Sequence, residues 1–248
     1  MRKTILITGA SSGLGRGMAR EFAAMGRNLA LCARRTERLD ALKAELEAQY
    51  PTIKISVRPL DVLDYDQVFE VFQAFNQEFN GIDRIIVNAG LGKGQPLGTG
   101  YFYANRQTAE TNFVAALAQC EAAMEIFRAQ NAGHLVVVSS VSALRGMPGN
   151  INTYAATKAG VAALAEGIRS EMLGKPIKVS TLFPGFIRSE INEKMRHTPF
   201  MVDTETGCRL LVKAIEKEKA NAIVPAWPWA LIGLLMRTLP LGLVKKLG

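Results

Sequence analysis

Short runs of apolar residues alternate along the chain with longer stretches of helical periodicity, and this alternation constrains the fold more than any other feature. Seven runs predict strands, several of them apolar on both faces as buried parallel strands are. They span residues 4–8, 28–33, 53–57, 84–88, 134–139, 178–183 and 222–225. Between them, apolar residues recur at helical spacing, as at Leu14, Met18 and Phe22. We therefore predict one α/β domain over residues 1–248, a doubly wound sheet with helices on both faces.

Charge and residue counts exclude several classes of protein. Lys and Arg number 30 against 22 Asp and Glu, and the net charge of +8 suits phosphate, nucleic acid or an anionic membrane. Because no basic stripe with interleaved aromatics is present, we expect no nucleic-acid partner. Three separated cysteines and two histidines predict neither a disulfide framework nor a metal site.

The ends of the chain predict a cytoplasmic protein. The N-terminus lacks the apolar core of a signal peptide. Residues 220–236 contain no charged residue, but Pro225, Pro228 and Gly233 interrupt them, and the stretch falls short of a membrane-spanning helix.

The first predicted strand ends in a glycine-rich loop, Thr8-Gly9-Ala10-Ser11-Ser12-Gly13-Leu14-Gly15. Gly9 permits a tight turn, while Gly13 and Gly15 let the backbone approach a pyrophosphate and let the helix pack on the strand. The first N–H groups of that helix would face the anion. The loop therefore predicts a dinucleotide site, with a plain strand–helix turn as the alternative. Its predicted members are Gly9, Ser11, Ser12, Gly13, Leu14 and Gly15.

The residues after the second strand distinguish NAD from NADP. NAD sites place an acidic residue there for the ribose 2′-hydroxyl, whereas this chain has Ala33-Arg34-Arg35-Thr36, and its nearest acid, Glu37, lies past the strand. Guanidinium groups suit a 2′-phosphate because they offer a fork of charged donors. We therefore predict NADP(H), with Arg34 as the stronger candidate and Arg35 beside it. A solvated charge pair is the alternative.

Tyr154 and Lys158 lie four residues apart on a predicted helix, so their side chains share one face. A free phenol has a pKa near ~10, and an adjacent ammonium lowers that pKa by favouring the phenolate. Such a pair can pass a proton to or from a substrate oxygen. This spacing is common by chance, but the strand before the helix brings Ser139 and Ser140 to the edge where open α/β sheets bind ligands.

Together these motifs resemble the short-chain dehydrogenases/reductases, and the resemblance runs from Thr4 to about Ile191. It implies a single Rossmann-type domain whose seven strands lie in the order 3-2-1-4-5-6-7. It also implies an NADP(H)-dependent oxidoreductase that interconverts a ketone or aldehyde and an alcohol, a secondary one for a ketone. In chain order the matching motifs are Thr8-Gly9-x-x-x-Gly13-x-Gly15, Asp61-Val62, Asn88-Ala89-Gly90, Asn112, Ser140, Tyr154-x-x-x-Lys158 and Pro184-Gly185.

The resemblance implies a role for each matching residue. Tyr154 would be the general acid–base, and Ser140 would hydrogen-bond the substrate oxygen. Lys158 would hold the nicotinamide ribose and lower the pKa of Tyr154, and Asn112 would hold a water that links Lys158 to solvent. Asp61 could equally be only the polar end of a buried strand. The implied cofactor contacts are Asp61 and Val62 near the adenine, Asn88, Ala89 and Gly90 beside the cofactor, and Pro184, Gly185 and Ile187 along the nicotinamide.

The chain departs from the family pattern at two positions. The serine usually lies thirteen residues before the tyrosine, where this chain has Val141, whereas Ser140 lies fourteen before and Ser142 twelve. We infer one extra residue in segment 149–153 and choose Ser140, with Ser142 as the lesser candidate. A threonine often follows the Pro-Gly motif to hold the carboxamide, and here Ser189 stands near that place.

The segments after the sixth strand are predicted to lie at the substrate-binding end of the site. Residues 188–202 would form a substrate lid, in which His197 is expected to be a surface residue. Residues 226–248 form an apolar tail with two tryptophans, Trp227 and Trp229, flanked by Arg237, Lys245 and Lys246. A segment in a membrane interface and a lid or dimer contact covered by protein fit this tail equally. Either one favours a lipophilic carbonyl or alcohol, steroid-like or acyl-chain-like.

The sequence also leads to an expected assembly and to two alternative functions. The resemblance implies a homodimer or homotetramer, since small side chains along residues 154–173 permit close packing beside the helix that carries Asn112. One alternative function is a catalytically silent NADP(H)-binding regulator, which the complete set of Asn112, Ser140, Tyr154 and Lys158 argues against. The other is a dehydrogenase of small polar alcohols or hydroxy acids.

Overall fold

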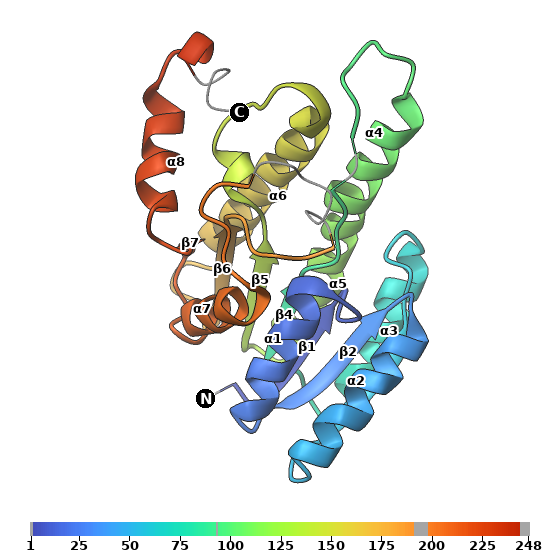
Figure 1. The fold of residues 1–248 in the computed structure, drawn as a ribbon. Coiled ribbons are helices and arrows are strands. Elements are labelled where there is room, and N and C mark those ends of the chain that lie inside the picture. Colours follow the sequence, from blue (N-terminus) through green and yellow to red (C-terminus); the bar gives the residue numbers. More distant parts are fainter. Residues whose placement is uncertain (1, 93, 191–197, 244–248) are drawn as a thin grey trace.

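A seven-stranded parallel sheet forms the centre of the computed structural model, which describes residues 2–92, 94–190 and 198–243 (Figure 1). The order of its strands, β3-β2-β1-β4-β5-β6-β7, confirms the predicted Rossmann-type topology. Each pair of neighbours runs parallel, as when Leu6 lies opposite Ala30 on one side and Ile85 on the other. The strands are β1 (Thr4–Thr8), β2 (Asn28–Ala33), β3 (Ile55–Pro59), β4 (Arg84–Val87), β5 (Gly133–Val138), β6 (Ile177–Pro184) and β7 (Asn221–Val224).

Helices cover both faces of the sheet, as the apolar periodicity predicts. One buried cluster joins the sheet to apolar residues of α3, α5 and α6, and a second joins it to α1, α2 and α7. The last helix, α8, lies at the β7 end of the molecule (Figure 1). The α-helices are α1 (Gly13–Ala24), α2 (Thr36–Gln49), α3 (Tyr65–Phe79), α4 (Phe102–Ala109), α5 (Ala115–Ala129), α6 (Asn152–Glu171), α7 (Thr204–Glu216) and α8 (Trp229–Thr238).

Two elements differ from the sequence prediction by more than one residue at an end. The third strand starts at Ile55, two residues later than predicted, because Ile53 belongs to the turn after α2, where its N–H donates to Tyr50 O (3.3 Å). The helix around Asn112 starts at Phe102, before the apolar spacing that begins at Phe113 and Leu117 in the sequence, and a π-helical turn at Glu110–Val114 interrupts it. The extra residue of such a turn disturbs the 3.6-residue period, so periodicity does not reveal the full length of the helix.

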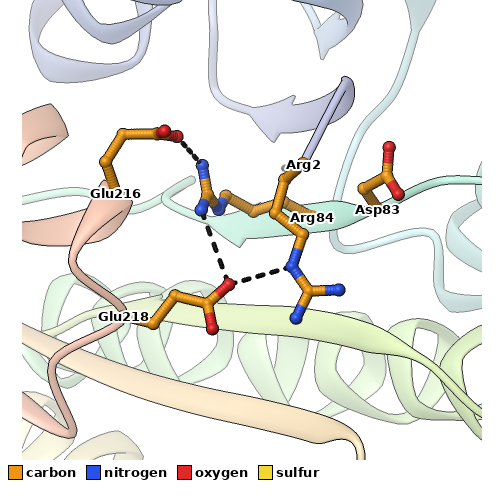
Figure 2. Close-up of a pocket in the computed structure, with 5 residues that line it drawn as sticks. All are labelled: Arg2, Asp83, Arg84, Glu216 and Glu218. Atoms are coloured by element: carbon orange, nitrogen blue, oxygen red, sulfur yellow. Dashed lines mark hydrogen bonds and ion pairs between the residues drawn. The ribbon is translucent and has the colours of Figure 1, made fainter.

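A network of charged residues joins the amino ends of the central strands to the end of α7 (Figure 2). Arg84 is buried and forms ion pairs with Glu216 and Glu218, and Arg2 also pairs with Glu218 (2.9 Å). With Asp83 these residues line a polar cleft of about 430 Å³. Each buried arginine thus has a carboxylate partner, and buried charges are stable only when they are paired in this way.

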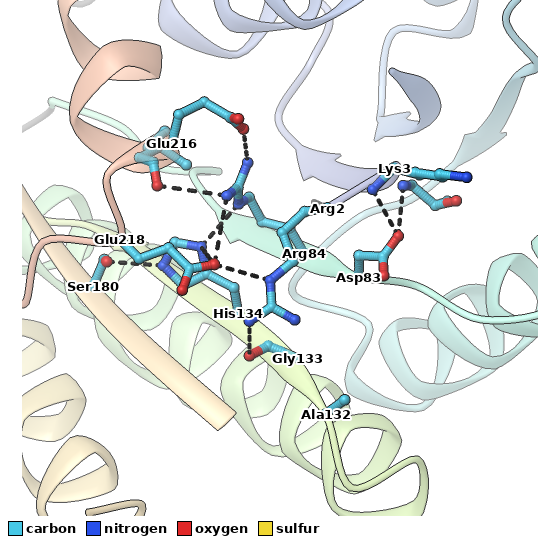
Figure 3. Close-up of polar contacts among 12 residues, drawn as sticks. Arg2, Lys3, Asp83, Arg84, Ala132, Gly133, His134, Ser180, Glu216 and Glu218 are labelled. Atoms are coloured by element: carbon cyan, nitrogen blue, oxygen red, sulfur yellow. Dashed lines mark hydrogen bonds and ion pairs between the residues drawn. The ribbon is translucent and has the colours of Figure 1, made fainter. Parts of the chain in front are cut away.

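His134 completes this network on β5 (Figure 3). Its Nδ1 accepts a hydrogen bond from Arg84 Nε (2.8 Å), and its Nε2 lies 2.8 Å from Ser180 Oγ. Burial and the Arg84 charge lower the pKa of His134 to about 2, so the imidazole stays neutral. In that tautomer Nε2 carries the proton and donates a hydrogen bond to Ser180 Oγ, so both ring nitrogens have a hydrogen-bond partner.

Two observations on the described part of the chain concern membrane spans and metal ligands. Among residues 2–92, 94–190 and 198–243, no helix combines the length and the apolar character needed to cross a bilayer. Within the same residues, no three His, Cys, Asp or Glu side chains gather as metal ligands would.

Candidate active site

The glycine-rich loop between β1 and α1 forms a cradle that larger residues would fill. Gly9 has φ +66°, and a Cβ there would lie 2.9 Å from Ala89 Cα. A Cβ at Gly15 would lie 2.3 Å from Gly9 O. The N-cap residue of α1, Ser12, makes no side-chain capping bond, and the first turn contains no acid. The start of α1 therefore presents N–H groups and the positive end of the helix dipole to an anion.

Asn88 and Thr8 join the end of β4 to this loop. The Thr8 hydroxyl accepts hydrogen bonds from the backbone N–H groups of Asn88 (3.0 Å) and Ala89 (3.1 Å). The Asn88 amide donates to Thr8 O (2.9 Å). Asn88, Ala89 and the loop glycines thus come together as predicted, with Asn88 acting on the backbone of the loop.

Arg35 is the arginine that reaches the phosphate loop. Its Nη2 donates to Ser12 Oγ (2.6 Å) and its Nε to Ser11 Oγ (3.3 Å). Arg34, which the sequence favoured, is exposed to solvent. Because Arg35 precedes the first residue of α2, its side chain turns back over the loop, a direction that strand periodicity does not reveal. The guanidinium of Arg35 therefore lies where a 2′-phosphate site is expected.

Two residues missed by the sequence analysis, Arg38 and Glu190, complete this charged cluster. Glu190, in the segment after β6, accepts from Arg35 Nη1 (3.0 Å) and from Arg38 Nη1 (2.5 Å). These hydrogen bonds, that from Arg38 foremost, lower the pKa of Glu190. The three-residue spacing of Arg35 and Arg38 at the start of a helix could have indicated a shared face. The pairing with Glu190, 152 residues farther along the chain, could not be foreseen.

Asp61 and Val62 lie at the turn after β3, and the structure gives both of them local contacts. Asp61 Oδ1 accepts from Leu63 N (3.1 Å), and Asp61 N donates to Gln67 Oε1 (2.9 Å). Val62 is part of the apolar core. These contacts suit the polar end of a buried strand, and the adenine contact of Asp61 and Val62 stays a prediction.

Lys158 and Tyr154 extend from α6 toward the carboxyl end of β5. Lys158 is buried, and its Nζ donates to Val138 O (2.9 Å). Burial lowers the pKa of Lys158 to about 8. The ammonium lies 6.0 Å from the centroid of the Tyr154 ring. In the chain by itself, burial raises the pKa of Tyr154, and interaction with the Ser140 hydroxyl opposes that rise. Lys158 is not among the causes of the shift, so the lowering of the Tyr154 pKa that the sequence predicts is not seen.

Ser140 lies two residues after the end of β5 and interacts with Tyr154. Its Oγ accepts a hydrogen bond from Ser142 N (3.1 Å), which orients the hydroxyl. The preceding Ser139 has a structural role, because its hydroxyl donates to Lys158 O (2.7 Å) and so attaches α6 to β5. A short 3-10 turn at Gly149–Ile151 occupies the place where the sequence analysis inferred an extra residue.

Asn112 lies within the π-helical turn and is buried beneath Leu91. Its Oδ1 accepts from Leu91 N and its Nδ2 donates to Leu91 O, both at 2.8 Å. Gly90 lies between Asn112 and Lys158, since a Cβ there would be 3.1 Å from Asn112 Oδ1 and 3.4 Å from Lys158 Nζ. π-helical turns are frequent at functional sites. The geometry brings Asn112 close to Lys158, and the linking water stays a prediction.

The Pro184-Gly185 motif at the end of β6 packs against the indole ring of Trp229. A Cβ at Gly185 would lie 2.3 Å from Trp229 Nε1. Trp229 is only 5% exposed and packs against Phe186, with ring centroids 5.3 Å apart. Of the two equally weighted predictions for the tail, burial of Trp229 agrees with a segment covered by protein, because this ring fills the space that the glycine leaves open. Trp227 is exposed.

The segment after β6 is described in part. Ile187 pairs with Val202 as an isolated bridge, and a Cβ on Gly13 would lie 3.4 Å from Ser189 Cβ. Ser189 thus lies beside the phosphate loop, where its contact with a carboxamide stays a prediction. Residues 191–197, which include His197, lie outside the described residues, so the lid predicted over 188–202 stays a prediction as well.

Comparisons with known proteins agree with this geometry. The family model described as short chain dehydrogenase matches residues 3–199. An uncharacterized oxidoreductase of Mycobacterium tuberculosis H37Rv is 55% identical over 245 residues, 99% of this chain and 97% of the relative.

Two solved structures show the same fold. A short chain dehydrogenase/reductase of Burkholderia phymatum in complex with NAD has a TM-score of 0.83 at 22% identity, covering 93% of this chain and 92% of that one. An alcohol dehydrogenase of Thermococcus sibiricus complexed with 5-hydroxy-NADP has a TM-score of 0.79 at 24% identity, covering 89% and 95%.

Proposed function

The chain belongs to the short-chain dehydrogenase family and is an oxidoreductase of that type, and on this premise we propose that it uses NADP(H) to interconvert a ketone or aldehyde and its alcohol. The observation that carries the proposal is the meeting of Ser140, Tyr154 and Lys158 at the carboxyl end of β5. A hydroxyl, a phenol and an ammonium there can bind a substrate oxygen and move its proton.

The residues present fit a dinucleotide. The glycine cradle has no room for side chains, the start of α1 is uncapped, and Arg35 covers the loop serines. Gly9, Gly13 and Gly15 would hold the pyrophosphate, and Arg35 would hold the 2′-phosphate, with Arg34 beside it. When bound, the nicotinamide supplies or accepts the hydride.

The protein's own residues then manage the proton and the orientation of the substrate. In the reducing direction, the Tyr154 phenol donates its proton to the carbonyl oxygen while the Ser140 hydroxyl donates a hydrogen bond to the same oxygen. The resulting phenolate is stabilised by the Lys158 ammonium, which faces no carboxylate in its described contacts. Lys158 would also bind the hydroxyls of the nicotinamide ribose.

The side chains beyond Ser140 favour a lipophilic substrate, steroid-like or acyl-chain-like. Val141, Phe183 and Trp229 form a buried apolar cluster beside the end of β5, and Phe186 packs against it. Phe200 places its ring centroid 6.4 Å from that of Trp229. An apolar wall next to a few polar groups is the usual lining of a site for an apolar ligand.

The test is NADPH oxidation by the protein with a panel of steroid ketones, acyl ketones, sugars and keto acids. We expect turnover with lipophilic ketones, and a loss of turnover in Tyr154→Phe. Turnover of keto acids alone would support the second function, a dehydrogenase of small polar substrates. NADPH binding without turnover of any carbonyl or alcohol would support the silent regulator.

We also propose a homodimer or homotetramer in the cytoplasm. The helix that carries Asn112 and α6 are the packing surfaces that the resemblance implies. Exposed Val114 and Leu117, on the first of these, support the proposal because lone apolar side chains there would be covered by a partner. Sedimentation velocity of the wild type and of Leu117→Glu tests it, with a monomeric wild type as the contradicting result.

A further inference from the structure

Three neighbouring segments at the carboxyl edge of the sheet form a surface that we call the apolar cationic face. It comprises residues 91–103 after β4 without residue 93, residues 141–151 after β5, and residues 226–243 after β7. The segments lie at the same end of the molecule (Figure 1). A Cβ at Gly94 would lie 2.1 Å from Asn150 O, and a Cβ at Gly233 would lie 2.6 Å from Leu144 Cδ1, so neighbouring loops touch.

Exposed apolar side chains are concentrated on this face. Of the sixteen large apolar side chains that are exposed among the described residues, ten lie here. Single exposed leucines are ordinary, but a contiguous patch of them marks a binding surface. The ten residues are Leu97, Tyr101, Phe102, Tyr103, Trp227, Leu231, Leu234, Leu235, Leu241 and Leu243.

The helix α8 presents opposite sides to the protein and to solvent. Trp229 and Gly233 are buried against the body of the protein. Leu234 is 60% exposed, and Leu231 and Leu235 are exposed beside it. Trp227, just before the helix, is 77% exposed. A helix that packs on the protein with one side and exposes leucines on the other, next to an exposed tryptophan, suits a segment that lies in the plane of a membrane interface.

The charge pattern of this face indicates the class of partner that binds it. The described segments of the face, residues 91–103 without residue 93, 141–151 and 226–243, contain no Asp or Glu. Arg145 donates to Arg237 O (3.0 Å) and to Leu239 O (3.2 Å), which places a guanidinium at the end of α8. Arg145 and Arg237 are the charged residues of these parts of the face, and both are cationic.

An anionic lipid surface fits these charges better than a second copy of the chain. Two copies joined through this face would bring like charges together without a carboxylate between them, and such contacts are unfavourable. A bilayer that carries acidic lipids attracts basic residues near its surface and accepts the leucines and Trp227 into its interfacial region.

We propose that the apolar cationic face docks onto the surface of an anionic phospholipid bilayer, with α8 lying in the interface. The carboxyl edge of the sheet, which carries Ser140 and the end of β5, then faces the lipid. This last consequence rests on the proposed function, because it would let a lipophilic carbonyl compound enter the site directly from the membrane.

The test is co-sedimentation of the whole protein with phosphatidylcholine vesicles, with and without phosphatidylglycerol. We expect binding that depends on the acidic lipid and weakens with added salt. The variant Leu231→Glu/Leu234→Glu should bind at least about ten-fold more weakly, since each exposed leucine contributes apolar area to the contact. Leu173→Glu is the matched control. Leu173 is 73% exposed and follows the C-terminal end of α6, whereas the face lies at the start of that helix.

A spectroscopic measurement locates the contact and keeps the proposal independent of folding and catalysis. Brominated lipids should quench the fluorescence of Trp229→Phe, which retains Trp227, and leave that of Trp227→Phe nearly unchanged. Tyr154→Phe should bind vesicles like the wild type even if it has no activity. The proposal would be overturned by an absence of lipid binding, or by equal lipid binding of the double glutamate variant and the wild type. A double variant whose only change is a lower sedimentation coefficient would also overturn it, in favour of a second copy of the chain on this face.

Discussion

Trp229 and Gly185 meet directly, because the indole of the C-terminal helix occupies the space that a Cβ at Gly185 would need. This contact joins α8 to the end of β6, at the motif expected to border the nicotinamide. If Gly185 borders the nicotinamide as proposed, the helix forms part of the active-site wall as well as of the outer surface, and a change at Trp229 should affect both stability and substrate turnover.

Trp229→Ala should lower the free energy of unfolding by about 3–5 kcal/mol, because it empties a buried site next to Phe186. Trp229→Phe keeps most of the apolar volume and should lose much less. Urea unfolding of both variants checks this. Equal stability of Trp229→Ala and the wild type would show that the indole contributes no packing at Gly185.

Arg35→Ala should weaken NADPH binding by about ten- to a hundred-fold, since a hydrogen-bonded charge contact contributes about 1.5–3 kcal/mol. Binding of NADH, which has no 2′-phosphate, should change little. Arg34→Ala is the matched control, and its effect on NADPH should be smaller because Arg34 is exposed and Arg35 contacts Ser11 and Ser12. Fluorescence titration with both cofactors measures this. An unchanged ratio of the two affinities in Arg35→Ala would exclude the 2′-phosphate contact.

Glu190→Gln should tighten NADPH binding several-fold and leave NADH binding nearly unchanged. The Glu190 carboxylate holds the guanidinium of Arg35 (3.0 Å), so a 2′-phosphate must compete with it for the same donors. Removing the charge also removes its repulsion of the phosphate. The same titration at low and high salt checks this. Weaker NADPH binding in Glu190→Gln would indicate that Glu190 holds the arginines in place for the phosphate.

The strands and the helix that carries Tyr154 and Lys158 could be predicted because both depend on local patterns, whereas the strand order followed from the family resemblance. Buried parallel strands show as continuous apolar runs, and Tyr154 and Lys158 share a helix face at any i, i+4 spacing. The position of Trp229 could not be predicted, since it depends on where a helix far along the chain packs. The choice between Arg34 and Arg35 depends likewise on how the chain turns into α2.

The pH dependence of carbonyl reduction should have an alkaline limb near the pKa of Lys158. Burial lowers that pKa to about 8, so raising the pH through 8 removes the ammonium that stabilises the Tyr154 phenolate. Activity should therefore be present below pH 8 and fall above it. Lys158→Met lacks the titrating group and should be less active at every pH, without this limb. The same limb in Lys158→Met would assign it to another group.

Transfer of deuterium from C4-deuterated NADPH to the product tests the central claim most directly. The wild type should place the label on the carbinol carbon of a lipophilic ketone, and Ser142→Ala should do the same. Tyr154→Phe and Ser140→Ala should bind NADPH normally and transfer the label at least about a hundred-fold more slowly, as expected when a general acid or a donor to the substrate oxygen is lost. Label transfer by Tyr154→Phe at the wild-type rate would contradict the assignment of Tyr154 as the proton donor.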